Sequence, residues 1–249
     1  MDQLSYIPFL FPGLKKVKCL FTTRHGGQSQ ANYAGANLSY EVGDQPEYVL
    51  QNRQAIQDKE QFTYWQELKQ VHGTKALSEP SPAYASQYPE HEGDGLMTSR
   101  SDQALVIKVA DCQPILLAHN SGSCIAALHI GWRGNRAGFI QKGVKEFCQN
   151  YQLRPSDIFA VRGPSLGPGH SEFINFQTEW GANFFSYYNL HSQTMDLWQL
   201  SKDQLLQAGL TAQNIFSLDL CTYSLPELFF SYRRDAVCGR QAGIIWIKR

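Results

Sequence analysis

Short runs of apolar residues recur along the chain, each bounded by polar or turn-forming positions, as is typical of buried β-strands. Residues 17–23 and 104–110 are the clearest of these runs. Residues 157–162, 215–220 and 243–247 predict three further strands. The pattern therefore predicts strands distributed over most of the chain.

One pair of apolar runs predicts a β-hairpin. Residues 115–118 and 124–130 flank the sequence Asn-Ser-Gly-Ser at 120–123, which is a turn signal between two strands. Two longer segments, residues 46–60 and 136–151, instead have helical length and spacing. A hairpin among helices argues against a purely parallel, doubly wound sheet, so we predict an α+β or mixed-sheet layer architecture.

Composition narrows the class of protein. The 249 residues contain 22 Lys plus Arg and 22 Asp plus Glu, and 43% of them are hydrophobic, so the chain can bury a sizeable core. A neutral chain lacks the electrostatic signature of a nucleic-acid or anionic-membrane binder, and it has no apolar run long enough to span a bilayer. The six Cys have no framework spacing, and we find no signal peptide. Both favour the cytoplasm.

Reactive polar residues stand at the ends of three apolar runs: Gln-Val-His-Gly-Thr at 70–74, Ala-Asp-Cys-Gln-Pro at 110–114 and Leu-His-Ile-Gly-Trp-Arg-Gly at 128–134. Cys112 and His129 are symmetric about the centre of the predicted hairpin turn. Antiparallel pairing then places them opposite or nearly opposite each other, with Cβ atoms about 4.5–5.5 Å apart. At that separation the two side chains can share one tetrahedral ion.

A third ligand, His72, needs only to arrive from a neighbouring segment. Three N/S ligands with a vacant fourth position are the pattern of a catalytic zinc site, whereas structural zinc is normally closed by four protein ligands. The residues alone also allow a structural interpretation. A lone Cys is usually a small buried hydrophobic residue, and His129 can be a hydrogen-bonded core histidine.

Three other local features carry alternatives. Arg24 lies in a Gly-containing turn after the strand at 17–23, where it can hold phosphate or form an ion pair on the surface. Asp94 lies in the tight turn at 93–98, as a functional carboxylate or as part of an Asx turn. Residues 231–235, Ser-Tyr-Arg-Arg-Asp, predict a solvated charge cluster in which one Arg can order the C-terminal strands.

Six motifs occur together in one order: Phe-Thr-Thr-Arg at 21–24, Gln-Val-His-Gly-Thr at 70–74, Gly-Asp-Gly-Leu-Met-Thr at 93–98, Ala-Asp-Cys-Gln-Pro at 110–114, His-Ile-Gly-Trp-Arg-Gly at 129–134 and Gly-Pro-Ser-Leu-Gly-Pro at 163–168. This combination resembles the YfiH/multicopper polyphenol oxidase-like family, also described as the laccase-domain or purine nucleoside phosphorylase-like family. The resemblance extends over essentially the whole chain.

The resemblance implies a single domain over residues 1–249, in which mixed β-sheets form sandwich-like layers with surrounding helices. It places the family's metal ligands on His72, Cys112 and His129. It implies a zinc-dependent purine nucleoside phosphorylase acting on adenosine, inosine and methylthioadenosine, with adenosine deaminase activity. Purine nucleosides and phosphate are then the partners, and we expect a monomer.

Two other enzyme classes, multicopper oxidases and Cys–His amidases, are alternatives to a phosphorylase. The full multicopper oxidase machinery needs roughly ten His, often in His-x-His pairs. This chain has seven His and no such pair. We therefore reject laccase as the native function, although one His₂Cys site can load copper in vitro. The second class is a Cys–His amidase acting in peptidoglycan precursor editing, in which Cys112 is the nucleophile and His129 its base. That interpretation leaves His72 without a role.

The preferred mechanism assigns roles to further residues. Arg24 or Arg133 holds phosphate against the ribose while the glycosidic bond loosens. Asp111 or Asp94 handles the proton at the base or leaving group. Catalytic roles therefore fall on Asp111, Cys112 and Arg24, and substrate-binding roles on Arg24, Asp94 and Arg133.

Overall fold

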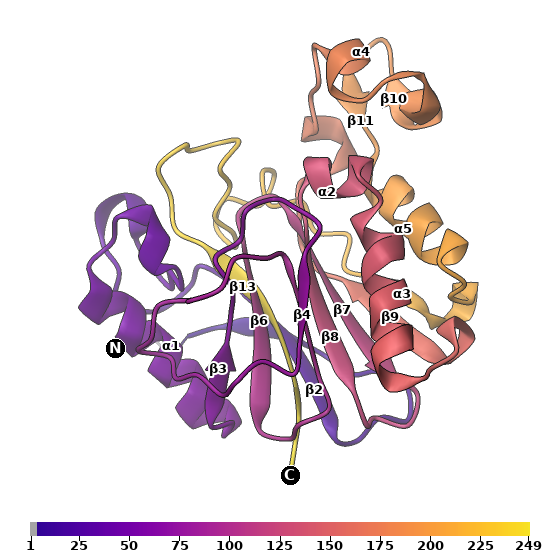
Figure 1. Cartoon of the computed structure of the whole chain (residues 1–249). Coiled ribbons are helices and arrows are strands. Elements are labelled where there is room, and N and C mark those ends of the chain that lie inside the picture. Colours follow the sequence, from indigo (N-terminus) through magenta and orange to yellow (C-terminus); the bar gives the residue numbers. More distant parts are fainter. Residues whose placement is uncertain (1–3) are drawn as a thin grey trace.

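Two β-sheets lie face to face at the centre of the molecule (Figure 1), and the computed structural model describes residues 4–249. The first sheet has the strand order β1-β2-β13-β6-β3, and the second has the order β12-β9-β7-β8-β5-β4. The first consists of β1 Tyr6–Phe9, β2 Val17–Thr22, β3 Tyr64–Gln66, β6 Gln103–Val109 and β13 Gln241–Ile247. The second consists of β4 Ala76–Ser78, β5 Gly95–Thr98, β7 Gln113–His119, β8 Ile125–Ile130, β9 Ile158–Arg162 and β12 Ile215–Ser217.

A common apolar core joins the two sheets. Phe21 of β2 and Ile245 of β13 pack in one buried cluster with Leu116 of β7 and Val161 of β9. Alternate residues of each strand point to opposite faces, so one face of each sheet forms this shared core and the other is free to receive helices. The central strands β6, β7, β8 and β13 are accordingly buried along almost their whole length.

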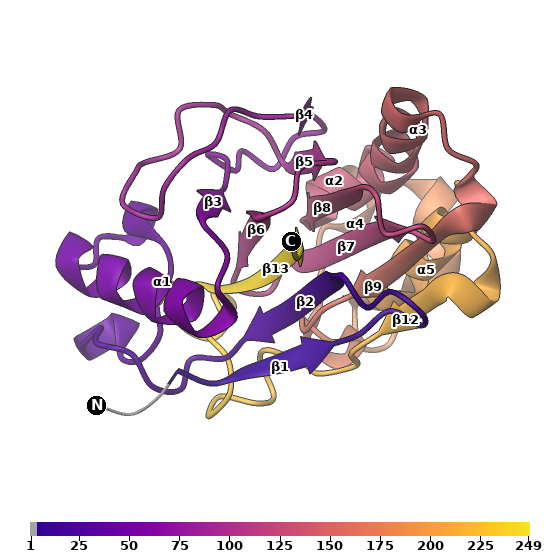
Figure 2. The same ribbon diagram turned by 90° about the horizontal axis from the view of Figure 1, so that it is seen from below.

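Helices cover the two outer faces (Figure 2). Ile56 of α1 packs with the outer side chains of the first sheet, and Phe147 of α3 and Leu205 of α5 pack with those of the second. The helices are α1 Pro46–Glu60, α2 Trp132–Arg136, α3 Phe139–Tyr151, α4 Phe176–Glu179 and α5 Leu197–Gln207. The 3-10 turns are Ala31–Tyr33, Tyr40–Val42, Pro155–Asp157, Pro168–His170, Ala182–Tyr187 and Ala212–Asn214. Within residues 4–249, no helix combines the length and hydropathy needed to cross a bilayer.

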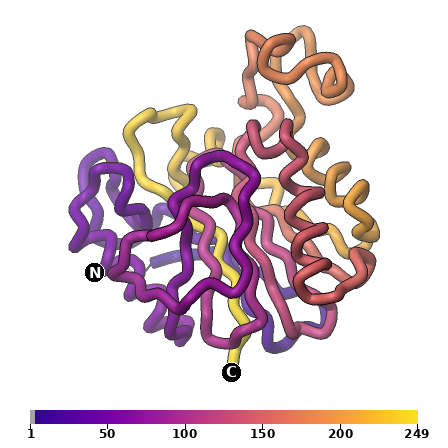
Figure 3. The backbone as a smooth tube through the Cα atoms, viewed as in Figure 1, coloured from indigo at the N-terminus to yellow at the C-terminus, as the bar shows by residue number. Residues whose placement is uncertain are grey.

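A small lobe projects beyond the sandwich (Figures 1 and 3). It contains α4 and the short hairpin of β10 Tyr188–Asn189 and β11 Thr194–Met195. Phe176, Trp180 and Met195 form its own buried cluster, against which Trp132 of α2 packs. The lobe is thereby fixed to the same end of the sheets at which α2 begins.

The sequence prediction of an α+β protein with sandwich-like mixed sheets is confirmed. Helix α1 has the predicted bounds, and the predicted helix at 136–151 is present as α3, which begins three residues later; the short helix α2 precedes it. Gly138 between them has φ +68°, a left-handed conformation that ends α2 and turns the chain into α3. Strand β1 was not predicted because Pro8 interrupts its apolar run. It is an edge strand, where a missing N–H is tolerated.

The predicted hairpin is present with a shifted register. Pro114, rather than Cys112, pairs with His129, and Gln113 pairs with Ile130. Cys112 therefore lies just before β7 and diagonal to His129, not directly opposite it. The shift arises in the turn, where the His119 N–H donates to the Cys124 carbonyl. Diagonal neighbours on one face are still within reach of long side chains.

A candidate metal centre and the cavity around it

His72, Cys112 and His129 come together at one end of the sheets. One donor atom from each lies within 4.8 Å of the other two, and Cys112 Sγ is 3.7 Å from His72 Nε2. His72 comes from the connection between β3 and β4, Cys112 from the residue before β7, and His129 from β8. The three segments meet because β5 and β7 both pair with β8.

The backbone around His72 is shaped for this approach. His72 has φ +58°, and its N–H donates to Asp94 Oδ1 at 2.9 Å. The N–H of Gly73 donates to the other oxygen, Oδ2, at 2.7 Å. At Gly131, a Cβ atom would lie 2.9 Å from the His72 ring and 3.3 Å from Cys112 Sγ. Only glycine at position 131 leaves room for both ligands.

Asp94 orients His129 as well as His72. Its Oδ1 is 2.8 Å from His129 Nδ1, and the Asp94 side chain is fully buried. Asp94 accepts a hydrogen bond from His129 Nδ1–H, which leaves Nε2 directed at Cys112; carboxylates behind a metal-ligating His fix its ring orientation in this way. Burial alone would raise the pKa of Asp94. The hydrogen bond and charge of His129, with the two backbone N–H groups, outweigh burial and lower the pKa.

The thiol of Cys112 is activated by its surroundings. Burial opposes its ionisation, but the charge and hydrogen bonds of His129 and His72 outweigh burial and lower the Cys112 pKa to about 6. Conversely, the Cys112 thiolate and Asp94 overcome the effect of burial on His129 and raise its pKa to about 9. In the metal-free protein at neutral pH, Cys112 is therefore mainly a thiolate beside an imidazolium.

A cavity of about 750 Å³ opens directly over these three residues. Five cationic side chains contribute to its wall: Lys69, Lys108, Arg133, Arg233 and Arg240. The apolar part of the wall includes Trp132, Phe173 and Leu197, of which the last two belong to the lobe or its base. A pocket of this size accommodates a small molecule with both an apolar and an anionic part.

The predicted site residues Arg133, Asp111 and Asp94 have different positions relative to this cavity. Arg133 and Asp111 line it, whereas Asp94 lies behind His129 and does not. Both Asp111 oxygens accept hydrogen bonds, from Thr222 Oγ1 at 2.7 Å and from the Arg233 N–H at 2.6 Å. The structure thus gives Asp94 a positioning contact with a ligand rather than a contact with substrate.

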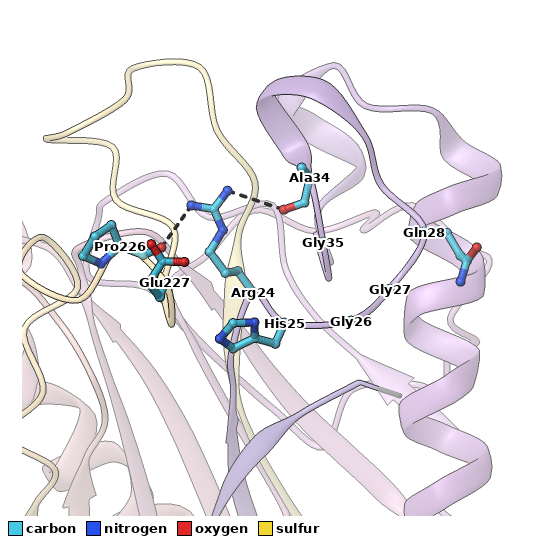
Figure 4. Close-up of a pocket in the computed structure, with 9 residues that line it drawn as sticks. All are labelled: Arg24, His25, Gly26, Gly27, Gln28, Ala34, Gly35, Pro226 and Glu227. Carbon is cyan, nitrogen blue, oxygen red and sulfur yellow. Dashed lines mark hydrogen bonds between the residues drawn. The ribbon is translucent and has the colours of Figure 1, made fainter. Parts of the chain in front are cut away.

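Arg24, predicted to hold phosphate or to pair on the surface, does not line this cavity. It lines a separate, open depression of about 600 Å³ (Figure 4). Its guanidinium donates to the Pro226 and Ala34 carbonyls and lies 4.7 Å from the Phe230 ring centre. These contacts connect the turn after β2 with the loop before β13, and they hold the side chain away from the three ligands.

The sequence interpretation missed the contribution of the segment before β13. Tyr232 and Arg233 are exposed, as predicted for a solvated cluster at 231–235, but they also line the cavity, as does Arg240. Arg234 is partly buried and donates to the carbonyls of Thr222, Tyr223 and Phe229, so it orders the loop. The two adjacent arginines at 233–234 were the only local sequence feature that could indicate a role in binding.

The donor set fits a tetrahedral metal ion. Typical Zn–S and Zn–N bond lengths imply donor–donor separations of about 3.4–3.6 Å, slightly shorter than the separations seen here, so a small inward movement suffices. His72 is the exposed member and His129 the buried one, so the group is open toward the cavity. Within residues 4–249, no fourth His, Cys, Asp or Glu joins this group.

Fold and site together define an α+β protein with an open His-Cys-His group that can hold a metal ion, under a ligand-sized cavity. The sequence model of one family, multi-copper polyphenol oxidoreductase laccase, matches residues 18–248. The chain belongs to this family, which confirms the resemblance seen in its motifs.

Similar proteins match over nearly the full length. The purine nucleoside phosphorylase YfiH of Escherichia coli K12 is 33% identical over 248 residues, covering 95% of this chain and 96% of that protein. A purine nucleoside phosphorylase of Haemophilus influenzae is also 33% identical, over 94% of this chain and 96% of that protein. The crystal structure of YlmD from Geobacillus stearothermophilus covers 100% of both chains, with TM-score 0.90 and 26% identity.

Proposed function

We propose that this protein is a zinc-dependent purine nucleoside phosphorylase acting on adenosine, inosine and methylthioadenosine, with adenosine deaminase activity. The observation that carries the proposal is the open His72-Cys112-His129 group at the base of a cavity with an apolar and a cationic wall. The purine nucleoside phosphorylases that match over nearly the whole chain support it. We further propose that it acts in the cytoplasm as a monomer.

Zinc is the proposed ion because one thiolate and two imidazoles are ligands it prefers, and three protein ligands are typical of its catalytic sites. When bound, zinc would act as a Lewis acid on an oxygen nucleophile. Copper can occupy the same ligands in vitro. Replacing His72, Cys112 or His129 individually by Ala should lower the zinc content from about one per chain to near zero, as measured by elemental analysis. Undiminished zinc in the Cys112→Ala protein would refute the assignment.

The remaining groups of the cavity suit a nucleoside and phosphate. Trp132 and Phe173, with ring centres 5.7 Å apart, offer an aromatic surface for the purine. Arg133, which also lines the cavity, is proposed to hold phosphate. In phosphorolysis a phosphate oxygen bonds to C1′ as the C1′–N9 bond breaks, and the purine leaves with the electron pair and takes up a proton. Asp111, next to Cys112, is the proposed residue for that proton.

Phosphate dependence tests this proposal. Free hypoxanthine and ribose 1-phosphate should form from inosine only when phosphate is present. Ammonia should form from adenosine without phosphate, since deamination replaces the 6-amino group by oxygen from water. Omitting phosphate is the matched control for each nucleoside. Equal rates of base release with and without phosphate would indicate a hydrolase and would contradict the proposal.

A second candidate, a Cys–His amidase acting on peptidoglycan precursors, is favoured by one observation. Asp94, His129 and Cys112 form a hydrogen-bonded series, with a carboxylate orienting an imidazole beside an activated thiol. The two candidates differ in what occupies the sulfur atom. Activity that survives complete removal of metal, with a covalent acyl adduct on Cys112 during turnover, would favour the amidase. Loss of activity on chelation and its recovery with zinc favour the phosphorylase.

A further inference from the structure

We propose that Arg233 and Arg240, together with Arg133, form the phosphate-binding subsite of the cavity. This inference rests on the proposed phosphorylase function and deepens it, because it assigns the co-substrate to residues from the loop before β13 and from α2. All three arginines line the cavity over the candidate metal centre. Three arginines from two segments, α2 and the loop before β13, thus meet at one cavity.

The three arginines differ from the lysines in the same wall by their missing counter-charges. Lys69 pairs with Glu92 at 3.0 Å, and Lys108 pairs with Glu41 at 2.6 Å. Across residues 4–249, no carboxylate forms an ion pair with the guanidinium group of Arg133, Arg233 or Arg240. The lysine charges are therefore paired with carboxylates of the protein, whereas the arginine charges are available to an anionic ligand.

The contacts of Arg240 hold its guanidinium in place and still leave donors free. One terminal nitrogen, Nη1, donates to the Cys238 and Gly239 carbonyls at 2.8 and 2.9 Å. Neutral carbonyl groups orient the side chain without cancelling its charge. The other guanidinium N–H groups of Arg240 have no acceptor among the described residues, so they can donate to a ligand oxygen.

Arg233 is placed next to the candidate metal centre by its own backbone. Its N–H donates to Asp111 Oδ2 at 2.6 Å, and Asp111 immediately precedes the ligand Cys112. Its Nη1 donates to the Glu172 carbonyl at 3.3 Å, which leaves the opposite edge of the guanidinium free. Arg133 stacks on the Trp132 ring at 4.3 Å and makes no side-chain hydrogen bond within residues 4–249.

Inorganic phosphate is the anion that fits this arrangement best. A planar guanidinium binds two oxygens of phosphate at once, and several arginines together hold a doubly charged ion firmly. The adjacent Trp132 and Phe173 belong to the apolar wall, so a nucleoside and phosphate can be held side by side over the ligands. This placement is what attack of phosphate on the ribose requires.

The test compares Arg233→Gln and Arg240→Lys with Arg136→Gln, a control on an exposed arginine of α2 that does not line the cavity. For each protein, titration calorimetry with inorganic phosphate measures binding without turnover. Steady-state assays then measure the KM for phosphate in phosphorolysis and the KM for adenosine in deamination, which needs no phosphate. The phosphate Kd and KM should rise about tenfold or more in both cavity variants, because each loses a charge-assisted or bidentate contact.

The KM for adenosine in deamination should stay within about twofold of the parent value, and Arg136→Gln should resemble the parent throughout. An unchanged phosphate Kd in Arg233→Gln and Arg240→Lys would overturn the subsite. Equal weakening of adenosine and phosphate would also overturn it, since the residues would then support the cavity as a whole. If the parent binds phosphate but cleaves no nucleoside, the phosphorylase proposal fails while the subsite stands. Tighter binding of adenosine 5′-monophosphate than of phosphate, lost in the same variants, would reassign the subsite to a nucleotide.

Discussion

The Asp94→Asn substitution tests how much one buried carboxylate contributes to the candidate metal centre. Asn has the same shape as Asp, so the cavity and the packing stay the same. One carboxylate oxygen becomes an NH₂ group, however, and this group replaces either Oδ2 or Oδ1. In the first orientation it faces the Gly73 N–H, and in the second it faces both the His72 N–H and His129 Nδ1. At least one buried N–H group therefore loses its acceptor.

The expected magnitude follows from these contacts. An unsatisfied buried donor costs about 1–3 kcal/mol, and loss of the charged partner of His129 removes a further charge-assisted bond. We therefore expect the metal-free protein to lose about 2–3 kcal/mol of unfolding free energy. Zinc affinity should fall by about 10–100-fold, since a ligating His that loses its orienting carboxylate is also less basic.

Two measurements check this prediction. Urea unfolding of the metal-free protein gives the stability change, and competition with a chromophoric chelator gives the zinc affinity. Asp58→Asn, on an exposed position of α1, is the matched control and should change neither value. Zinc affinity within twofold of the parent in Asp94→Asn would show that the Asp94–His129 contact does not tune the ligand, and the reasoning would be wrong.

Four further predictions concern the candidate metal centre and the buried Arg53–Glu67 ion pair. In metal-free protein, alkylation of Cys112 by iodoacetamide should be half-maximal near pH 6, and bound zinc should slow it strongly. Because this pKa is lowered, the stabilisation from the thiolate is fully present above pH 9 and is lost as the pH falls through about 6, which pH-dependent unfolding would reveal. Gly131→Ala should abolish zinc binding while leaving a folded protein by circular dichroism, since the new Cβ lies 2.9 Å from the His72 ring. Glu67→Gln should cost about 3–5 kcal/mol in urea unfolding, because it leaves the fully buried Arg53 without its counter-charge.

Local patterns predicted much of the fold. Helix α1 and the strands β2, β6, β9 and β13 were located to within a few residues, because each has a clear apolar period. Strands of three or four residues, such as β3, β4 and β5, were missed. Their pairing partners lie far away in sequence, so the pattern of a short segment alone does not predict that these strands form.

The sequence predicted the three candidate metal ligands but not the contacts that position them. Cys112 and His129 belong to one hairpin, so their proximity could be inferred from local symmetry, although the register differs by two residues. Asp94 was singled out, but its contact with His129 depends on the pairing of β5 with β8, which no local signal shows. The separate depression lined by Arg24 could not be foreseen, because a turn after a strand indicates exposure and not the direction of the side chain. The role of Arg233 depends on a loop folding back onto Asp111, which composition cannot indicate.

The position of β13 has a consequence for biosynthesis. It lies between β2 and β6 in the middle of the first sheet, yet it is the last described strand to leave the ribosome. Until it emerges, β2 and β6 each present an unpaired edge, so the nascent chain carries two templates for misassociation. The loop before β13 carries Tyr232, Arg233 and Arg240. These residues complete the cavity wall only when that strand is inserted. The nascent protein therefore has no complete cavity until translation of this segment is finished, and synthesis itself delays the onset of ligand binding.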